Sequence, residues 1–191
     1  MAPLIFDIET KNTFFDVGGN DPALLDISVV GIYDYATNTL KAFVEHEFKE
    51  MWPYFEKADA IVGYNSEHFD IPLLNKYYAC DLTKIKSIDL MKAIQDSLGR
   101  RIKLQDVASA TLGVSKSGQG LDAITWWKEG KIDKIIEYCL KDVSITRDLF
   151  DYMKRHGEVF IPDGGGVSKL SINTKSWNEG DRMRLTHAMP W

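Results

Sequence analysis

Leu4-Ile5-Phe6-Asp7-Ile8-Glu9-Thr10 is the stretch of sequence that decides the fold. It is too short for a helix, and its branched and aromatic residues favour a β strand. Because successive side chains of a strand point to opposite faces, Asp7 and Glu9 leave the same face, about 6.6 Å apart along the chain. Two carboxylates among apolar neighbours raise each other's pKa unless a cation lies between them. The alternative interpretation is a strand end whose acids face solvent.

Strands and helices alternate in the sequence that follows this strand. A polar, glycine-bearing loop at 11–26 leads to two apolar runs, and the segment 34–39 between them has the length and chemistry of a hairpin turn. The predicted strands are 4–10, 27–33, 40–44, 60–64 and 85–88, and the predicted helices are 47–57, one from 70 onward, 90–98, 104–112, 121–128 and 132 to near 157. This order predicts an α/β fold with three layers around a mixed sheet of about five strands.

The chain of 191 residues fits one domain, which we predict over 1–160. The stretch Pro162-Asp163-Gly164-Gly165-Gly166 is interpreted as a flexible hinge, so that 161–191 forms a C-terminal tail. No window approaches the roughly 20 apolar residues that a membrane-spanning helix needs, and no membrane partner is expected.

The net charge of −5 argues against binding nucleic acid through bulk positive charge. A cluster of acids that holds divalent cations would give the same sign, with the cations meeting an anionic substrate. The N-terminus meets a carboxylate too early for a secretory signal, and Cys80 and Cys139 are too far apart in sequence for a thiolate metal motif. These features predict a cytoplasmic protein.

Two further acids stand at informative positions. Asp70 opens a predicted helix just after a buried strand, where its ordinary role would be that of an N-cap. Tyr138 and Asp142 are four residues apart on the long helix and therefore share a face. Neither feature indicates chemistry alone, since such residues occur on many helices.

Together these residues form three spaced motifs. They are D-x-E at Asp7 and Glu9, N-x-x-x-F-D from Asn65 to Asp70, and Y-x-x-x-D from Tyr138 to Asp142. The set resembles the DEDD superfamily of 3′–5′ exonucleases, whose fold is ribonuclease H-like.

The branch of that superfamily is indicated by Tyr138, which resembles the DEDDy type. The DEDDh branch has a histidine five residues before the last aspartate, where this chain has Glu137. The stretch 61–74 is similar to the proofreading domains of family-B DNA polymerases and still more to the YprB-like predicted exonucleases. The stretch 103–113 also resembles the helix before the family's third motif, and the whole resemblance covers roughly 3–155.

The resemblance implies a ribonuclease H-like α/β/α fold and a site for two divalent cations, Mg²⁺ or Mn²⁺. It implies that Asp7 bridges both metals, that Glu9 and Asp142 bind the metal that activates water, and that Asp70 binds the other largely through waters. Tyr138 would orient the attacking water, since its reference pKa of about 10 makes it a poor base at neutral pH. The chemistry of phosphodiester hydrolysis agrees with this. Two cations roughly 3.5–4 Å apart can help to deprotonate the attacking water, offset the charge of the phosphate and stabilise the leaving oxygen.

The expected substrate contacts are Thr10, Asn65 and Phe69. For Thr10 the alternative is a strand-end residue, and for Asn65 it is a role in tying the loop. Phe14 and Phe15 could stack a nucleobase, but for such an aromatic pair burial in the core is the favoured interpretation.

The predicted function is 3′–5′ exonucleolytic hydrolysis of nucleic acid at a single-stranded 3′ end, with single-stranded DNA favoured over RNA. Two alternatives stay open: an idle module on the same fold that binds nucleic acid or a partner, and a metal-dependent endonuclease or ribonuclease. A phosphatase of the haloacid dehalogenase type is rejected, because Glu9 stands where its motif needs a second aspartate.

Overall fold

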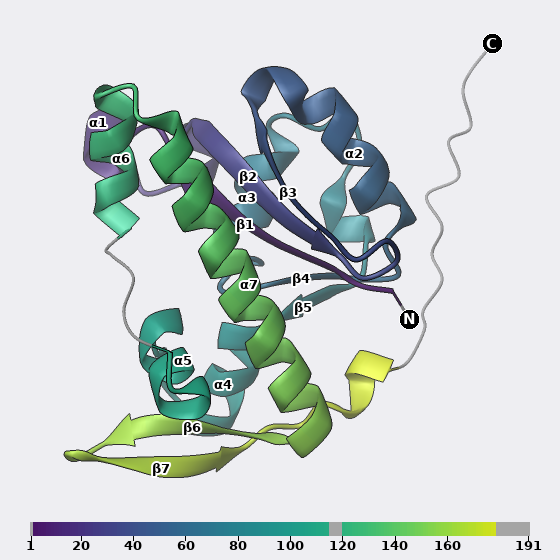
Figure 1. The fold of residues 1–191 in the computed structure, drawn as a ribbon, viewed down its shortest axis with the longest axis vertical. Helices are drawn as coiled ribbons and strands as arrows, with labels where there is room; N and C mark the ends of the chain where they lie inside the picture. Colours follow the sequence, from purple (N-terminus) through teal and green to yellow (C-terminus); the bar gives the residue numbers. More distant parts are fainter. Residues whose placement is uncertain (1, 115–119, 179–191) are drawn as a thin grey trace.

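The computed structural model describes residues 2–114 and 120–178 of the chain (Figure 1). Its centre is a five-stranded sheet in the order β3-β2-β1-β4-β5. The strands are β1 (Leu4–Thr10), β2 (Ile27–Asp34), β3 (Thr39–Val44), β4 (Ile61–Gly63) and β5 (Ser87–Asp89). β1 pairs antiparallel with β2 and parallel with β4, so the predicted mixed α/β sheet is confirmed.

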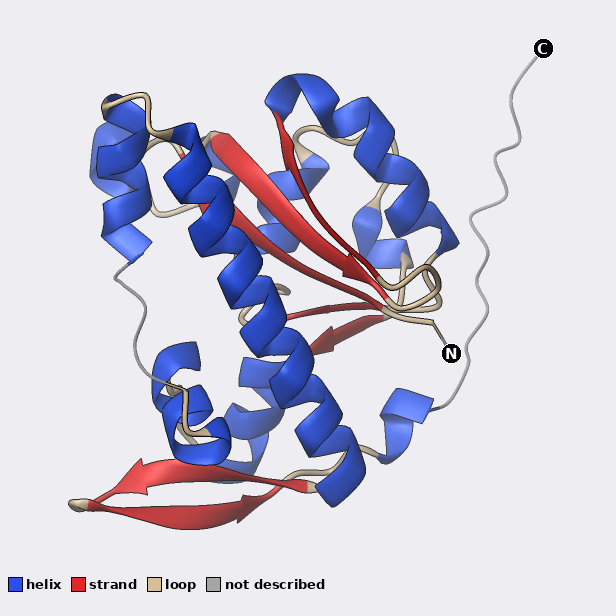
Figure 2. Cartoon of the chain, viewed as in Figure 1, coloured by secondary structure: helices blue, strands red, loops and turns tan. Residues whose placement is uncertain are grey.

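Helices cover both faces of this sheet (Figure 2). They are α1 (Phe14–Val17), α2 (Phe48–Lys57), α3 (Asp70–Asn75), α4 (Leu90–Leu98), α5 (Leu104–Leu112), α6 (Gly120–Lys128) and α7 (Ile132–His156). Short 3-10 helices lie at η1 (Pro22–Leu24), η2 (Glu45–Glu47), η3 (Leu82–Lys84) and η4 (Lys175–Asn178). Within the described ranges, none of the helices has the length and apolarity that a bilayer span requires.

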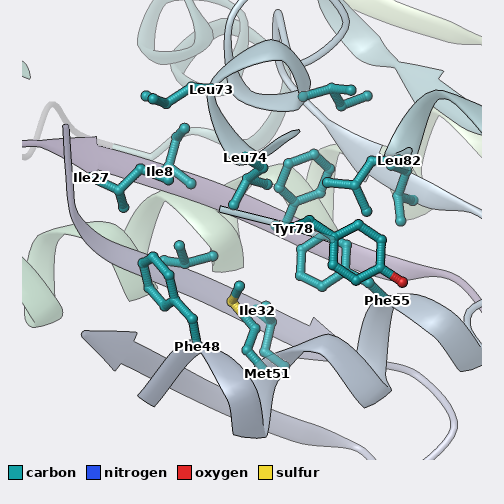
Figure 3. Packing of buried hydrophobic residues seen from close by; sticks show 14 of the residues in the cluster. Ile8, Ile27, Ile32, Phe48, Met51, Phe55, Leu73, Leu74, Tyr78 and Leu82 are labelled. Atoms are coloured by element: carbon teal, nitrogen blue, oxygen red, sulfur yellow. The ribbon is translucent and has the colours of Figure 1, made fainter. Parts of the chain in front are cut away.

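The alternation along β1 assigns its two faces. Leu4, Phe6 and Ile8 pack with residues of α2 and α3, and the rings of Phe6 and Phe55 meet edge to face at 5.4 Å. Figure 3 shows this apolar layer, in which side chains from the helices meet those of the sheet. Ile5 points the other way, into a cluster with residues of α7. Asp7 and Glu9 follow Ile5 at intervals of two, so they share the face that α7 covers.

Helix α7 packs directly on β2 at Gly31, a residue without a side chain. Gly31 is paired with Asp7 across the strands. A Cβ atom at Gly31 would stand 2.9 Å from both Cys139 Sγ and Val143 Cγ2, which is too short for atoms that are not bonded. The absent side chain therefore lets α7 bring its 138–142 turn against the carboxyl end of β1.

The predicted hinge is wrong, because Gly164 and Gly165 instead form the turn of a β hairpin. β6 (Glu158–Asp163) pairs antiparallel with β7 (Gly166–Ser171), as Figure 1 shows below α7. Gly164 and Gly165 have φ of 53° and 99°, a region in which glycine meets no steric penalty. The glycines that indicated flexibility supply a turn.

The hairpin and the residues after it pack on the domain. The Thr111 hydroxyl donates to the Phe160 carbonyl and accepts from the Phe160 N–H, both at 3.0 Å. Trp177 is buried and stacks on Phe150, with ring centroids 5.5 Å apart. The predicted boundary between 160 and 161 therefore falls inside β6, and packing continues to Trp177. Residues 179–191 of the predicted tail lie outside the described residues.

Candidate metal centre

Three carboxylates meet where the end of β1 faces α7. Asp7, Glu9 and Asp142 each offer an oxygen atom, and these atoms lie within 4.8 Å of one another. Glu9 and Asp142 are buried. The period of two along β1 and the period of 3.6 along α7 place these side chains on facing surfaces.

Asp70 lies beside this cluster without joining its 4.8 Å group. It is the first residue of α3 and is buried. Its carboxylate accepts hydrogen bonds from its own N–H and from the N–H of Ile8. The parallel ladder between β1 and β4 ends at Ile5 and Val62, and the charge of Asp70 acts on Asp7, two residues further along β1. Three of the four predicted acids therefore form one cluster, and the fourth, Asp70, lies next to it.

The acids of the cluster hold their protons more tightly than free carboxyls do. Burial raises the pKa of Asp7 well above its ordinary value, and the charges of Glu9, Asp70 and Asp142 raise it further. The pKa of Glu9 is raised in the same way, chiefly by burial and then by Asp142 and Asp70.

The pKa values of the other two acids are raised less far. Burial raises the pKa of Asp142 to about 6, although the Tyr138 hydroxyl donates to it and Lys141 lies near. Burial, followed by the charge of Asp89, raises the pKa of Asp70 to about 8.

This donor set fits a hard divalent cation. Carboxylate oxygens are the ligands that Mg²⁺ and Mn²⁺ prefer. No described lysine or arginine forms an ion pair with Asp7, Glu9, Asp70 or Asp142, so the charge that these acids develop on ionisation lacks a paired counterion, although Lys141 near Asp142 offsets part of it. A bound cation would supply one.

Tyr138 stands next to the cluster as the four-residue spacing predicts. Its hydroxyl donates to Asp142, and its ring meets Trp126 edge to face at 5.9 Å. Burial, followed by the charges of Asp142, Glu9 and Asp7, raises the pKa of the phenol well above its usual range. At neutral pH the hydroxyl therefore keeps its proton, which suits a hydrogen-bond donor and not a base.

A cavity of about 340 Å³ opens directly onto the acids. Asp7, Glu9, Tyr138 and Asp142 line it, together with Ile8, Asn12, Thr13, Leu25, Ile124 and the two predicted contacts Thr10 and Phe69. The Thr10 hydroxyl donates to the Asn12 carbonyl at 3.0 Å, so it also supports the loop after β1.

Asn65 is placed differently from the other predicted contacts, because it is absent from the cavity lining. Its backbone adopts φ of 65°, and its N–H donates to Asp89 Oδ1 at 2.9 Å. Asp89 Oδ2 also accepts from the N–H of Glu67, and together these bonds hold the turn that leads to Asp70. The turn is thus tied through the Asn65 backbone, whereas its side-chain Oδ1 is buried without a hydrogen-bond partner, and a substrate contact by Asn65 stays a prediction.

The two adjacent phenylalanines, Phe14 and Phe15, lie in different environments. Phe14 lines the cavity and meets Phe69 edge to face at 6.1 Å, whereas Phe15 is 93% exposed. Burial in the core is therefore the wrong interpretation for Phe15.

Gln105 and Cys139 touch the acids and were not among the predicted site residues. Gln105 Nε2 donates to Asp142 Oδ1 at 3.2 Å, and its buried Oε1 has no protein partner. The Cys139 thiol stands 3.8 Å from Asp7 Oδ2. Gln105 lies in the stretch that resembles the family's helix before the third motif, but nothing in that stretch indicates a contact 37 residues away along the chain.

Comparison with known proteins agrees with this architecture. Residues 4–154 match the RNase H superfamily, and the chain belongs to that family. Among solved structures it is similar to the family B DNA polymerase from the hyperthermophilic archaeon Pyrobaculum calidifontis, with a TM-score of 0.61 and 20% identity. The match covers 80% of this chain and 24% of the polymerase, so the chain spans about a quarter of that protein's length. No curated protein sequence matches the chain.

Proposed function

We propose that this protein is a metal-dependent 3′–5′ exonuclease of the DEDDy type. The observation that carries the proposal is the meeting of Asp7, Glu9 and Asp142 at one end of the sheet, with Asp70 beside them. Membership of the RNase H superfamily and the order of the three motifs support it. The proposed substrate is a single-stranded 3′ end, with DNA favoured over RNA.

The four carboxylates would hold two divalent cations, Mg²⁺ or Mn²⁺. Such cations, when bound, offset the charge of the phosphate and lower the pKa of the attacking water. The chain's own residues position the reactants. Tyr138 donates to Asp142 and keeps its phenolic proton, so it acts through orientation. Thr10 and Phe69 line the cavity in which the terminal nucleotide would lie.

The buried acids weigh against an idle binding module. Crowded carboxyl groups with raised pKa values cost folding free energy at neutral pH, and a domain that only binds a partner gains nothing from them. The endonuclease or ribonuclease alternative uses the same metals and differs in where the substrate is cut.

A cleavage assay tests the proposal directly. Single-stranded DNA and RNA of equal sequence, labelled at the 5′ end, are incubated with the protein and Mg²⁺ or Mn²⁺. We expect a ladder that shortens from the 3′ end, that EDTA abolishes, and that forms faster on DNA. Internal cuts would favour the endonuclease alternative. Absence of cleavage, together with absence of metal uptake in calorimetry, would favour the binding module.

Replacing Tyr138 with phenylalanine tests its orienting role. We expect Tyr138→Phe to lower kcat by about 10- to 100-fold, the usual cost of losing a hydrogen bond that orients a metal ligand. Metal affinity in calorimetry should change much less than the rate. Tyr152→Phe, on the same helix where Tyr152 packs on His156, is the matched control and should keep full activity. Unchanged turnover in Tyr138→Phe would restrict Tyr138 to a packing role.

A further inference from the structure

Phe15 is an aromatic ring that the fold leaves in solvent. At 93% it is the most exposed of the large apolar side chains named in the described residues, ahead of Val167 at 60%. Aromatic rings are among the side chains that gain most from burial. A single exposed apolar side chain is ordinary on a protein surface, so the informative feature of Phe15 is its position next to Phe14, which lines the cavity.

The loop that carries Phe15 is tied down by its own hydrogen bonds. The Thr13 hydroxyl accepts from the Asp16 N–H, and the Asp16 carboxylate accepts from the Thr13 N–H, which together cap α1. Gly18 ends this helix in the left-handed conformation. Asn12 and Asp26 exchange two hydrogen bonds of 2.9 Å across the base of the loop. The local structure therefore holds the backbone that directs the ring outward.

Phe15 directly follows Phe14, which faces the cavity. Phe14 and Phe69 line that cavity together with Asp7, Glu9 and Asp142. Phe14 therefore faces the cavity, whereas Phe15 is absent from the cavity lining and faces solvent from the same short helix. A nucleic-acid strand whose terminal nucleotide occupied the cavity would have its next base outside the cavity, where α1 presents the Phe15 ring.

We propose that Phe15 is a stacking residue for the base next to the 3′-terminal nucleotide of a single strand. This inference rests on the proposed exonuclease function and assigns its substrate a second contact. Stacking tolerates any base, since each presents a π face, but it needs a base that is not already stacked in a duplex. It also suits a chain with a net charge of −5, which cannot rely on bulk attraction to phosphate.

The test compares substrates with and without that base. Phe15→Ala should raise KM for a single-stranded oligonucleotide by about tenfold, within the range measured for loss of one stacked base. Phe15→Trp should preserve KM. Hydrolysis of the p-nitrophenyl ester of thymidine 5′-monophosphate, which has no neighbouring base, should be the same in all three proteins. Val167→Ala, on β7, is the matched control for loss of an exposed apolar side chain and should behave as wild type.

An abasic position next to the 3′ terminus should remove the difference between wild type and Phe15→Ala, whereas an abasic position four nucleotides away should not. Equal KM values for wild type and Phe15→Ala on the intact oligonucleotide would overturn the inference. So would a dimer in sedimentation that Phe15→Ala dissolves, because the ring would then serve a second copy of this chain.

Failure of the exonuclease itself would be recognised separately. In that case wild type would hydrolyse neither the oligonucleotide nor the ester. Fluorescence anisotropy of a labelled oligonucleotide would still report on Phe15, with tighter binding by wild type than by Phe15→Ala as the supporting result and equal binding as the contrary one.

Discussion

We expect the single substitution Asp7→Asn to have two effects: it abolishes hydrolysis, and it stabilises the metal-free protein. Asparagine keeps the shape of aspartate and removes its charge. A bound metal ion contributes several kcal/mol to transition-state stabilisation, and each 1.4 kcal/mol is about a factor of ten in rate, so we expect a loss of about a thousandfold or more. Single-turnover cleavage of a labelled oligonucleotide measures it.

The expected gain in stability has the same physical origin as the loss of activity. Asp7 is surrounded by Glu9, Asp70 and Asp142, whose charges together with burial raise its pKa well above the ordinary value. A neutral side chain at this position ends that repulsion. At pH 8 we expect the free energy of unfolding of the metal-free protein to rise by about 1–3 kcal/mol, since one unit of pKa corresponds to about 1.4 kcal/mol.

Asp96→Asn is the control for this experiment, because Asp96 is exposed on α4. It should leave both rate and stability near wild type. A wild-type rate in Asp7→Asn would remove the proposed mechanism. Loss of activity with a destabilised fold would instead assign Asp7 a structural role.

The second large effect concerns pH. We expect the free energy of unfolding of the metal-free protein to decrease as the pH rises. A carboxyl whose pKa is higher in the folded than in the unfolded state binds more protons when folded, so the free energy of unfolding falls with increasing pH. The decrease begins near the unfolded pKa of about 4. The free energy of unfolding continues to fall as the pH passes the folded-state pKa values, about 6 for Asp142 and about 8 for Asp70.

Divalent cations should reverse this trend, since they bind the ionised carboxylates and release protons. At a hundredfold excess over Kd, ligand binding stabilises by about 2.7 kcal/mol, and each kcal/mol raises Tm by about 2–4 °C in a protein of this size. We expect Mn²⁺ to raise Tm by about 5–10 °C at pH 8 and by much less at pH 5.5. Thermal unfolding with and without Mn²⁺ measures both values.

Two controls separate site binding from general salt effects. Potassium chloride at the same ionic strength should not reproduce the shift, because screening acts on exposed charges and far less on buried ones. Asp7→Asn should lose most of the Mn²⁺ response. A shift of equal size at both pH values would contradict proton release from the acids, and no shift at all would contradict the metal site.

Periodicity along the chain predicted most of the secondary structure. The short apolar run rich in branched residues at 4–10 identified β1, and the 3.6-residue spacing in 132–156 identified α7. The hairpin of β6 and β7 was missed because Gly164 and Gly165 are compatible with either a hinge or a turn. Its packing depends on the contact of Thr111 with Phe160, 49 residues apart along the chain. The residues near either position in the sequence do not indicate such a contact.

The sequence by itself determined that Asp7 and Glu9 share a face, and that Tyr138 and Asp142 share another, because strand and helix geometry impose these relations within one element. Only the tertiary structure decided that the two faces meet. That meeting depends on Gly31, where the absence of a side chain lets α7 approach β1. The same holds for Gln105, which reaches Asp142 from a separate helix.

The two phenylalanines of α1 show this division most clearly. Adjacent in sequence and identical in chemistry, Phe14 and Phe15 could not be told apart from their residue types. The cap at Thr13 and the ties between Asn12 and Asp26 orient the loop so that one ring lines the cavity and the other meets solvent. The direction of a side chain on a loop depends on contacts between distant residues, and these exist only in the folded chain.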